Sequence, residues 1–349
     1  MKVARLYGKE DIRIEENDEP EPGHGQVKLK NAFAGLCGSD LHLYYNPESL
    51  GVDLTVPHPL TGAHLPQILG HEFSGTVVEL GPGVEGYAVG DRVSVWPIYY
   101  CDKCAACAKG MFNACEMIAF HGIMSDGGGL AEYTTVPSSK LHKLPENVSL
   151  EMGALVEPMA VAWHAVELAG VEPGGSALIA GAGPIGIGLW FALRAHGIDT
   201  IVVSEPSSVR RAAIEAVGAR TVLDPSTDDL DAAVRLATNG RGVDVAFDAA
   251  GVGPAFMSSI RCLTPGGRAV VVAMHEKAFD FDPSQMVMRE TDVRGSLAYL
   301  QSDFDAVIEA MSQGHYAIGD WVSTTTLDHI TDALASLRGG TAIKVIVSS

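Results

Sequence analysis

The sequence is short of basic residues. Its 349 residues include 24 lysines and arginines against 43 aspartates and glutamates, a formal charge of -19 at pH 7. Proteins that bind nucleic acid or anionic membranes usually carry the opposite balance, because lysine and arginine neutralise phosphates. We therefore expect a small-molecule partner, with no nucleic acid and no membrane.

The sequence also lacks a convincing apolar run. The N-terminus, MKVARLYGKEDIRIEE, has no stretch of signal-peptide length. The uncharged segment 173–193 approaches the length of a membrane span, but several glycines and Pro184 interrupt it. A strand, a turn and a buried helix suit this segment better, and we expect a cytoplasmic protein.

Cysteine is scarce, and its distribution is uneven. Of the six cysteines, four fall in the stretch CDKCAACAKGMFNAC; they are Cys101, Cys104, Cys107 and Cys115. Four thiolates at this spacing can surround one tetrahedral ion, as in closed structural zinc sites. Such a site leaves no position for a substrate, so catalytic chemistry is expected elsewhere.

Other uses of these four cysteines are open. Disulfides are disfavoured in a reducing compartment, and buried thiols without a metal are a further alternative. An iron–sulfur cluster is the strongest rival, although bacterial ferredoxin runs end in a proline after closer spacing, whereas Glu116 follows here.

The chain changes character near residue 155. Before it, short β-rich runs such as VKLKNAF, FSGTVVEL and DRVSVW are separated by turns. From 155 to 298 strands and helices alternate, which predicts a parallel sheet covered by helices on both faces. The tail predicts helices in DFDAVIEAMSQG and HITDALASLRGG, then a strand in AIKVIVSS.

A glycine-rich turn lies in the alternating region. SALIAGAGPIGIGLWFALRAHG reads as an apolar strand, a GxGxxG turn and a helix, which is the context of a dinucleotide site. In this motif Gly181 permits the turn, Gly183 admits the pyrophosphate and Gly186 lets helix and strand pack closely. Pro184 and Ile185 complete the expected cofactor loop.

The next strand, TIVVSE, ends at Glu205. An acidic side chain there can accept hydrogen bonds from the adenosine ribose and repels a 2′-phosphate, so NAD is expected rather than NADP. Arg210 and Arg211 are a competing signal, because basic side chains near this place can accommodate a phosphate or can simply face solvent.

A second group of potential ligands comes from separate stretches. Cys37 lies in AGLCGSDLH, and His71 and Glu72 lie in LGHEFSG. A thiolate, an imidazole and a carboxylate are ligands of open catalytic zinc sites. Taken alone, however, a lone cysteine or histidine is more often an ordinary buried residue.

The order of several motifs resembles one family. AGLCGSDLH, GHEFSG, VGDRV, the four-cysteine lobe and LVEPMAVAWHAV are similar to the zinc-dependent medium-chain alcohol and polyol dehydrogenases over essentially the whole chain. The resemblance implies a Rossmann doubly wound parallel sheet (155–298) inserted into a GroES-like β-rich catalytic domain (1–154 and 299–349), and a dimer or tetramer.

The resemblance also implies the catalytic zinc ligands. Cys37 and His71 match the family's ligands, Glu72 lies at the metal, and Glu157 of VEP matches the polyol branch, where classical alcohol dehydrogenases have cysteine. Whether Glu72 or Glu157 is the fourth ligand is left open. Zinc would lower the pKa of the substrate hydroxyl, and hydride would pass to the nicotinamide of NAD.

Four further roles follow from the resemblance. Ser39 and His42 match a path that carries the hydroxyl proton to solvent, and Asp40 matches a carboxylate that orients the ligating histidine. Lys344 matches a basic residue at the cofactor pyrophosphate, with an ordinary exposed strand lysine as the alternative. Ser39 and Asp40 could also be turn residues.

The substrate expectation depends on residues 44–68, which contain PHPLTG, and on GGGLAEY. These resemble the 2,3-butanediol (acetoin) dehydrogenases, while His58 of PHPLTG is expected to be a loop residue. Asp102 and Leu130 depart from the glycine and phenylalanine usual there. Rival hypotheses are a sorbitol-like polyol dehydrogenase, a non-catalytic zinc protein on this fold and a zinc-ribbon nucleic-acid binder.

Overall fold

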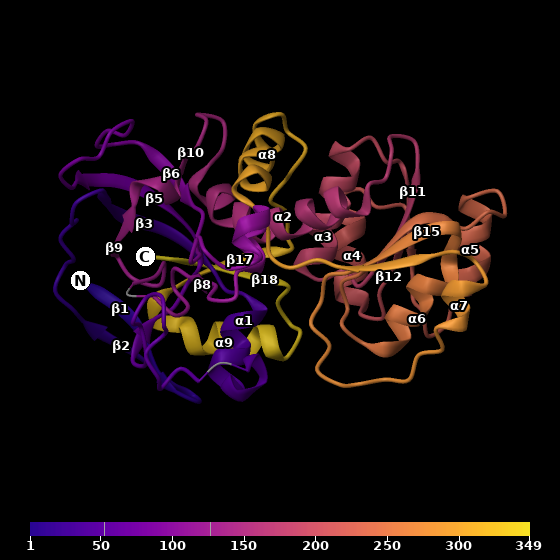
Figure 1. Ribbon diagram of the computed structural model, residues 1–349, viewed down its shortest axis with the longest axis horizontal. Helices are drawn as coiled ribbons and strands as arrows, with labels where there is room; N and C mark the ends of the chain where they lie inside the picture. The colour runs from indigo at the N-terminus through magenta and orange to yellow at the C-terminus, as the bar shows by residue number, and fades with distance from the viewer. Residues whose placement is uncertain (52, 126) are drawn as a thin grey trace. The chain divides into compact units, whose positions relative to one another are not determined.

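The computed structural model describes residues 1–51, 53–125 and 127–349. The chain forms two compact units, which Figure 1 colours along the sequence. The units are listed here by their segments: the first is Met1–Glu157, Leu300–Ser312 and Val322–Ser349, and the second is Pro158–Tyr299 and Gln313–Trp321. No helix in the described ranges is both long and apolar enough to cross a membrane.

One segment joins a different unit from the one expected. Residues 313–321 were predicted with the β-rich catalytic domain, but they belong to the second unit. Tyr316 provides the physical reason, because its buried ring lies 5.1 Å from the ring of Phe191 in that unit. The division between the units also falls inside a helix, between Glu157 and Pro158.

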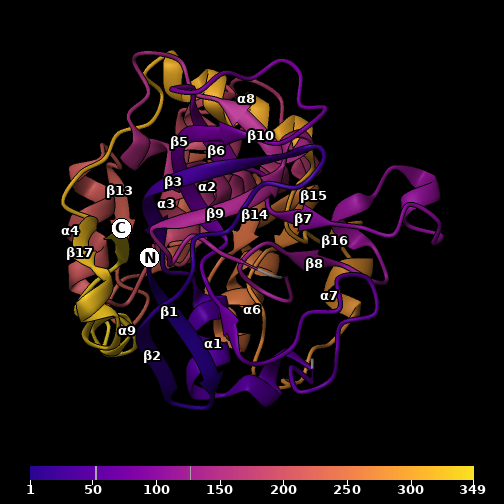
Figure 2. The same cartoon turned by 90° about the vertical axis from the view of Figure 1, so that its left-hand side faces the viewer.

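The first unit is built on β-sheet. Its main sheet has the order β10-β6-β5-β3-β18-β17, with β9 also paired to β3, and Figure 2 shows several of these strands side by side. The strands are β3 (Gln26–Gly35), β5 (Glu72–Leu80), β6 (Arg92–Val95), β9 (Tyr133–Pro137), β10 (Leu141–Lys143), β17 (Val322–Thr326) and β18 (Lys344–Ser348). The predicted strands in VKLKNAF, FSGTVVEL, DRVSVW and AIKVIVSS are thus confirmed.

Two small sheets and several helices complete this unit. The strands are β1 (Lys2–Gly8), β2 (Asp11–Glu16), β4 (Gln67–Ile68), β7 (Ile98–Tyr99) and β8 (Ala119–Phe120). The helices are α1 (Gly38–Tyr45), α8 (Gln301–Ser312), α9 (Ile330–Arg338) and the first part of α2 (Leu150–Ala169). Short 3-10 turns are η1 (Pro47–Leu50), η2 (Cys107–Lys109), η3 (Phe112–Ala114), η4 (Ser138–Lys140) and η5 (Leu327–His329). The two predicted tail helices correspond to α8 and α9.

The second unit contains a six-stranded parallel sheet. Its order is β13-β12-β11-β14-β15-β16, which in chain order is the doubly wound sequence 3-2-1-4-5-6. The strands are β11 (Ser176–Ala180), β12 (Thr200–Ser204), β13 (Thr221–Leu223), β14 (Val243–Asp248), β15 (Leu263–Val271) and β16 (Asp292–Gly295). Every residue of β11 is buried, as expected for a central strand covered on both faces.

Helices connect these strands and supply the core. They are α3 (Pro184–Ala195), α4 (Ser208–Ala216), α5 (Leu230–Ala237), α6 (Gly253–Cys262) and α7 (Ser284–Val287), and Figure 1 marks their positions along the unit. Helices α5 and α6 pack on a shared core, in which Val234 and Ile260 join Leu178 of β11. The sheet order changes direction between β11 and β14, the place at which such sheets bind ligands.

Candidate functional site

The first motif forms a tight corner between β3 and α1. Cys37 caps the helix, and its backbone N–H donates to Asp40 Oδ2 at 2.8 Å, which fixes the first turn. Leu36 N–H donates to Val345 O of β18 at 2.9 Å. The Ser39 hydroxyl lies 3.6 Å from Cys37 Sγ. The corner therefore holds the thiol and the hydroxyl of this motif together.

The second motif brings His71 and Glu72 to the same place. Glu72 opens β5 and pairs with Gly35 of β3, while Gly70 adopts φ +100°, a conformation that favours glycine. A Cβ atom on Gly35 would lie 2.0 Å from Glu72 Oε2. Gly35 is thus required so that the carboxylate can lie against β3.

Together these residues form one cluster of two buried residues and the half-buried Cys37, which we call the mixed cluster: Cys37, His71 and Glu72. Their ligand atoms all lie within 4.8 Å of one another. Among the described residues, Glu72 Oε1 is buried without a hydrogen-bond partner. Unpartnered buried polar atoms are costly, so a sulfur, a nitrogen and an oxygen here fit a bound zinc ion.

Asp40 lies behind the histidine. Its Oδ1 atom is 3.8 Å from His71 Nδ1, which is beyond hydrogen-bond distance, and neither atom has a hydrogen-bond partner in the part of the chain that the structure describes. Burial alone lowers the pKa of His71, but the charges of Asp40 and Cys37 raise it well above its ordinary value. Asp40 therefore faces the nitrogen that it was expected to orient, without a direct hydrogen bond.

Lys344 lies in the mixed cluster's surroundings and is not an exposed strand residue. Its side chain is 2% exposed, and its ammonium donates to Leu36 O at 2.9 Å and to Glu72 Oε2. Burial opposes its charge, but Glu72 raises the pKa of Lys344 above its ordinary value. The alternative of an exposed lysine is wrong, and its contact with a cofactor pyrophosphate stays a prediction.

Glu157 and His42 lie outside the three-residue group. Glu157 is buried in α2, and its carboxylate contributes to the raised pKa values of His71 and Lys344. Within the described chain the mixed cluster includes the oxygen of Glu72 and not that of Glu157. His42 is partly exposed on α1, three residues after Ser39 and so on the same helix face.

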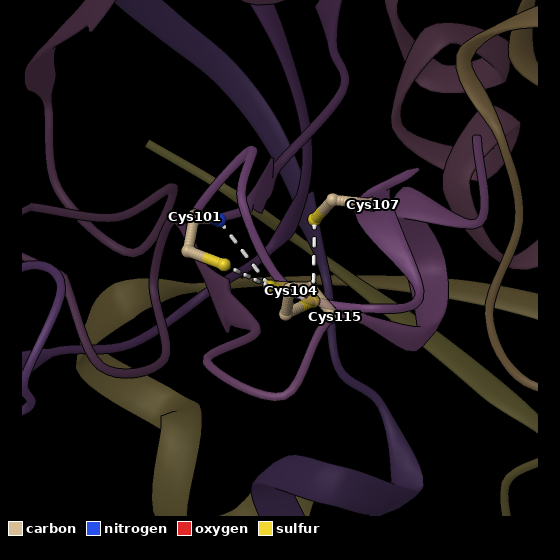
Figure 3. Close-up of side chains that lie close together, drawn as sticks. All are labelled: Cys101, Cys104, Cys107 and Cys115. Carbon is tan, nitrogen blue, oxygen red and sulfur yellow. Dashed lines mark hydrogen bonds between the residues drawn. The ribbon is translucent and has the colours of Figure 1, made fainter. Parts of the chain in front are cut away.

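The four-cysteine lobe is a second cluster. Figure 3 shows its side chains pointing toward one another, and adjacent sulfurs are 3.5 Å apart for Cys104 and Cys107 and for Cys101 and Cys115. All four sulfurs lie within 4.8 Å of one another, and all six cysteines are free. The disulfide alternative is therefore wrong, whereas zinc in this lobe stays a prediction.

The lobe's backbone prepares it for an ion. Backbone N–H groups, first that of Cys107, lower the pKa of Cys104 to about 6, whereas burial raises the pKa of Cys107 to about 12. Thiolate ligands must lose their protons, so one ligand is ready near neutral pH. Asp102 has φ +56°, which explains why glycine is usual at this position.

The glycine turn of the second unit has the expected geometry. Gly181 follows β11 with φ +101°, and a Cβ on Gly186 would lie 1.9 Å from Gly181 O. A Cβ on Gly183 would meet nothing within 4 Å, and Gly183 caps α3, whose first residues are Pro184 and Ile185. The turn thus leaves open space at a helix N-terminus, which suits a pyrophosphate.

Glu205 stands beside this turn. Its two carboxylate oxygens accept the backbone N–H groups of Ala182 at 2.7 Å and Ser207 at 2.8 Å. Arg211 is held by Asp224 at 3.0 Å and by the carbonyl of Glu205. Arg210 is partly exposed, and no ion pair of its side chain occurs within the described residues. Arg210 is thus the more available of the two arginines.

Two hydrogen bonds hold the loop that is expected to influence the choice of substrate. In PHPLTG the backbone N–H of Gly62 donates to His58 O at 2.7 Å, and the Thr61 hydroxyl donates to Met124 O at 2.6 Å. His58 belongs to neither group of potential metal ligands among the described residues. Val52 of this segment lies outside them.

Two features of the site were not foreseen from the sequence. The ion pair between Lys344 and Glu72 joins positions 272 residues apart, and no local pattern announces it. Gly35 could have been found, because a glycine inside a strand pattern often marks a close approach.

The chain is similar to known proteins over its full length. Residues 23–146 match the family model of the alcohol dehydrogenase GroES-like domain, and residues 184–313 match that of the zinc-binding dehydrogenase. An (R,R)-butanediol dehydrogenase of Bacillus subtilis (strain 168) is 40% identical, with 99% of each chain covered. An L-threonine 3-dehydrogenase of Pyrococcus furiosus is 37% identical, with 82% of this chain and 79% of the relative covered.

A solved structure agrees with this similarity. The crystal structure of 2R,3R-butanediol dehydrogenase from Bacillus subtilis matches with a TM-score of 0.91 and 39% identity. The match covers 100% of this chain and 99% of that one.

Proposed function

Because the chain belongs to the zinc-binding dehydrogenases with an alcohol dehydrogenase GroES-like domain, we propose that it interconverts 2,3-butanediol and acetoin with NAD. One observation carries the proposal. A chain that is 40% identical to a butanediol dehydrogenase over 99% of its length also holds a half-buried thiol, a buried imidazole and a buried carboxylate whose ligand atoms lie within 4.8 Å of one another. Reduction of diacetyl or acetoin is the corresponding reverse activity.

The proposal assigns a metal to each cluster. Cys37, His71 and Glu72 would hold a catalytic zinc. Glu157, whose charge acts on His71, could replace or join Glu72 as a ligand. The four cysteines of the lobe would hold a structural zinc. When bound, the catalytic zinc supplies a Lewis acid for the substrate oxygen, and NAD accepts the hydride.

The protein's own residues would manage the proton. Ser39 Oγ, beside Cys37 Sγ, would accept the proton of the substrate hydroxyl. His42, on the same face of α1 and partly exposed, would pass it to solvent. Asp40 would hold the His71 ring, and Lys344 would hold one oxygen of Glu72 while Oε1 stays free for the metal.

The second unit would hold the dinucleotide. The open space at Gly183 would admit the pyrophosphate, and Glu205 would face the adenosine ribose while it braces the turn through Ala182. A carboxylate at that place disfavours a 2′-phosphate, so NAD is preferred; the partly exposed side chain of Arg210 is the feature that could admit NADP.

Location and assembly are part of the proposal. Six free cysteines suit a reducing compartment, so the enzyme would work in the cytoplasm. Strand β16 is an edge of the parallel sheet, and an edge offers backbone groups to a second copy, which supports a dimer or tetramer.

The test is NADH formation by zinc-loaded protein with each 2,3-butanediol stereoisomer. Sorbitol, L-threonine and NADP are run in parallel. Fast, stereoselective oxidation of butanediol with NAD is expected. Activity on sorbitol or threonine alone would keep the chemistry and overturn the substrate, and no activity with two bound zinc ions would favour a non-catalytic zinc protein.

A further inference from the structure

The four-cysteine lobe connects two short paired strands, β7 and β8, and the chain that leaves β8 runs against the mixed cluster. Strands β7 and β8 pair Ile98 with Phe120 and Tyr99 with Ala119 at the base of the lobe. The chain then continues through Phe120, His121 and Gly122, which we call the hairpin exit. Both β7 and β8, and the mixed cluster, belong to the first unit.

Gly122 is pressed against the backbone that carries His71. A Cβ atom at Gly122 would lie 2.2 Å from Gly70 O and 2.9 Å from His71 N. These neighbours are backbone atoms, and Gly70 O is itself held by the N–H of Gly129 at 2.7 Å. The Gly70 side of this contact can yield only if the peptide immediately before His71 moves.

Phe120 contacts the histidine ring directly. The two ring centroids are 6.1 Å apart and the planes make an angle of 67°, an edge-to-face arrangement. The ring of Phe120 thus limits rotation of the imidazole on one side. The ring's polar contacts are a hydrogen bond with Cys37 and the more distant Asp40 carboxylate, 3.8 Å from Nδ1, so Phe120 adds an apolar restraint to them.

The hairpin exit is anchored to the sheet without using the cysteines. The His121 ring contacts the Tyr99 hydroxyl at 3.1 Å and the Thr134 hydroxyl of β9 at 3.0 Å, and its backbone N–H donates to Pro97 O at 2.8 Å. Lys140 adds a second anchor, because its buried ammonium donates to Ile98 O. The ammonium also lies 4.1 Å from the Trp96 ring.

We propose that Phe120 and Gly122 are positioning residues that set the orientation of His71 for metal binding. The inference rests on the proposed catalytic zinc at the mixed cluster. It assigns the hairpin exit, and not the sulfur atoms of the lobe, as the part of this segment on which the second metal site depends.

The test compares Gly122→Ala with Gly110→Ala, a matched control within the lobe. Gly110 has φ +73° and Gly122 has φ +86°, so both substitutions impose similar backbone strain. A Cβ on Gly110 meets nothing within 4 Å, whereas a Cβ on Gly122 meets Gly70 and His71. Phe120→Leu is a milder second variant in case Gly122→Ala does not fold.

Three readouts are measured on purified full-length protein: zinc equivalents per chain, the affinity of each equivalent by competition with a chelator, and the visible spectrum after cobalt substitution. Cys37→Ser protein provides the cobalt spectrum of the four-cysteine site alone, for subtraction. Thermal unfolding confirms that each variant is folded.

Gly122→Ala and Phe120→Leu are expected to weaken zinc binding at the mixed cluster by about 10- to 100-fold, as for other residues that orient metal ligands. They are also expected to change the cobalt bands of that site. In these two variants the zinc affinity of the four-cysteine lobe should equal that of the parent protein. In Gly110→Ala both zinc affinities should equal those of the parent. The inference is overturned if folded Gly122→Ala and Phe120→Leu keep the parent's affinity and spectrum, or if Gly110→Ala loses as much.

The metal readouts separate this inference from the proposed function. If the parent protein binds zinc only at the four-cysteine lobe, the assignment of the mixed cluster as a metal site is overturned, and the inference with it. A parent that binds two equivalents but does not oxidise butanediol would overturn the substrate alone, and the comparison of variants would still decide the inference.

Discussion

The two clusters of potential metal ligands are built in opposite ways. The lobe collects Cys101, Cys104, Cys107 and Cys115 from one loop-rich stretch, and its four sulfurs lie within 4.8 Å of one another. The mixed cluster takes Cys37 from the corner after β3 and His71 and Glu72 from the start of β5. Within residues 1–51, 53–125 and 127–349, Glu72 Oε1 has no hydrogen-bond partner. A site closed within one loop suits a structural role, and a site assembled between strands suits chemistry.

The difference also concerns surrounding charge. The lobe's thiols are influenced chiefly by backbone N–H groups and by burial. The mixed cluster is surrounded by the charged residues Asp40, Glu157 and Lys344, which come from three different helices or strands. Its properties therefore depend on how distant parts of the unit pack.

The largest expected effect comes from opening the mixed cluster. Cys37→Ser should reduce turnover by about 10³-fold or more, because a Lewis acid contributes several kcal/mol to the transition state. The melting temperature should hardly change, and bound zinc should fall from two equivalents to one. Cys262→Ser is the control, since this buried thiol lies in the second unit, 3.4 Å from Asp231. Loss of both zinc ions would erase the contrast between the clusters.

The converse change should act on stability. Cys104→Ala removes one sulfur of the closed site, and we expect the melting temperature to fall by roughly 10 °C, because binding energy at a structural zinc is folding energy. Turnover per folded molecule, measured well below the new melting temperature, should change little. An unchanged melting temperature with lost turnover would reverse the proposed roles of the two clusters.

A smaller effect is expected in the cofactor unit. Glu205→Ala removes acceptors for Ala182 and for the expected ribose hydroxyls, so KM for NAD should rise about tenfold, as for the loss of one hydrogen bond to a charged group. The preference for NAD over NADP should narrow. Arg210→Ala should act in the opposite direction on this preference. If the ratio of kcat/KM for the two cofactors stays constant, Glu205 does not read the ribose.

The smallest effect concerns pH and the hairpin between the clusters. Burial, with a contribution from Lys140, lowers the pKa of His121 from 6.5 to about 3. Between about pH 3 and pH 6.5, His121 therefore binds a proton in the unfolded chain but not in the folded protein. Folding stability is therefore lost as the pH falls through this window.

Urea titrations between pH 5 and pH 6 test this slope. His121→Gln should reduce the slope of unfolding free energy against pH by at most about 1.4 kcal/mol per pH unit, the contribution of one proton. His315→Gln, at an exposed histidine, is the matched control. Equal slopes for wild type and His121→Gln would show that His121 does not titrate as its burial implies.

Local patterns accounted for much of this molecule. Four cysteines within one short stretch must lie near one another in almost any fold, so the lobe was predictable from spacing. The turn at Gly181, Gly183 and Gly186 was predictable for the same reason, because its geometry depends on a strand, a turn and a helix that are adjacent in sequence. The alternation of strands and helices likewise predicted the parallel sheet.

The mixed cluster could be named from the sequence only through resemblance. Its composition depends on the register that pairs Gly35 with Glu72 and on the place of β18 beside β3. A shift of one residue in either pairing would turn these side chains to the other face. The sequence contains the residues, but no local sequence pattern predicts the register in which these strands pair.

Only the tertiary structure decided three features. Lys344 pairs with Glu72 across 272 residues, Tyr316 draws residues 313–321 into the second unit, and Gly122 presses on the peptide before His71. The sequence by itself determined the local units, the lobe, the glycine turn and the helices, because short-range sterics and spacing specify them. Contacts between distant segments arise when whole sheets pack, and their energies depend on the complete fold.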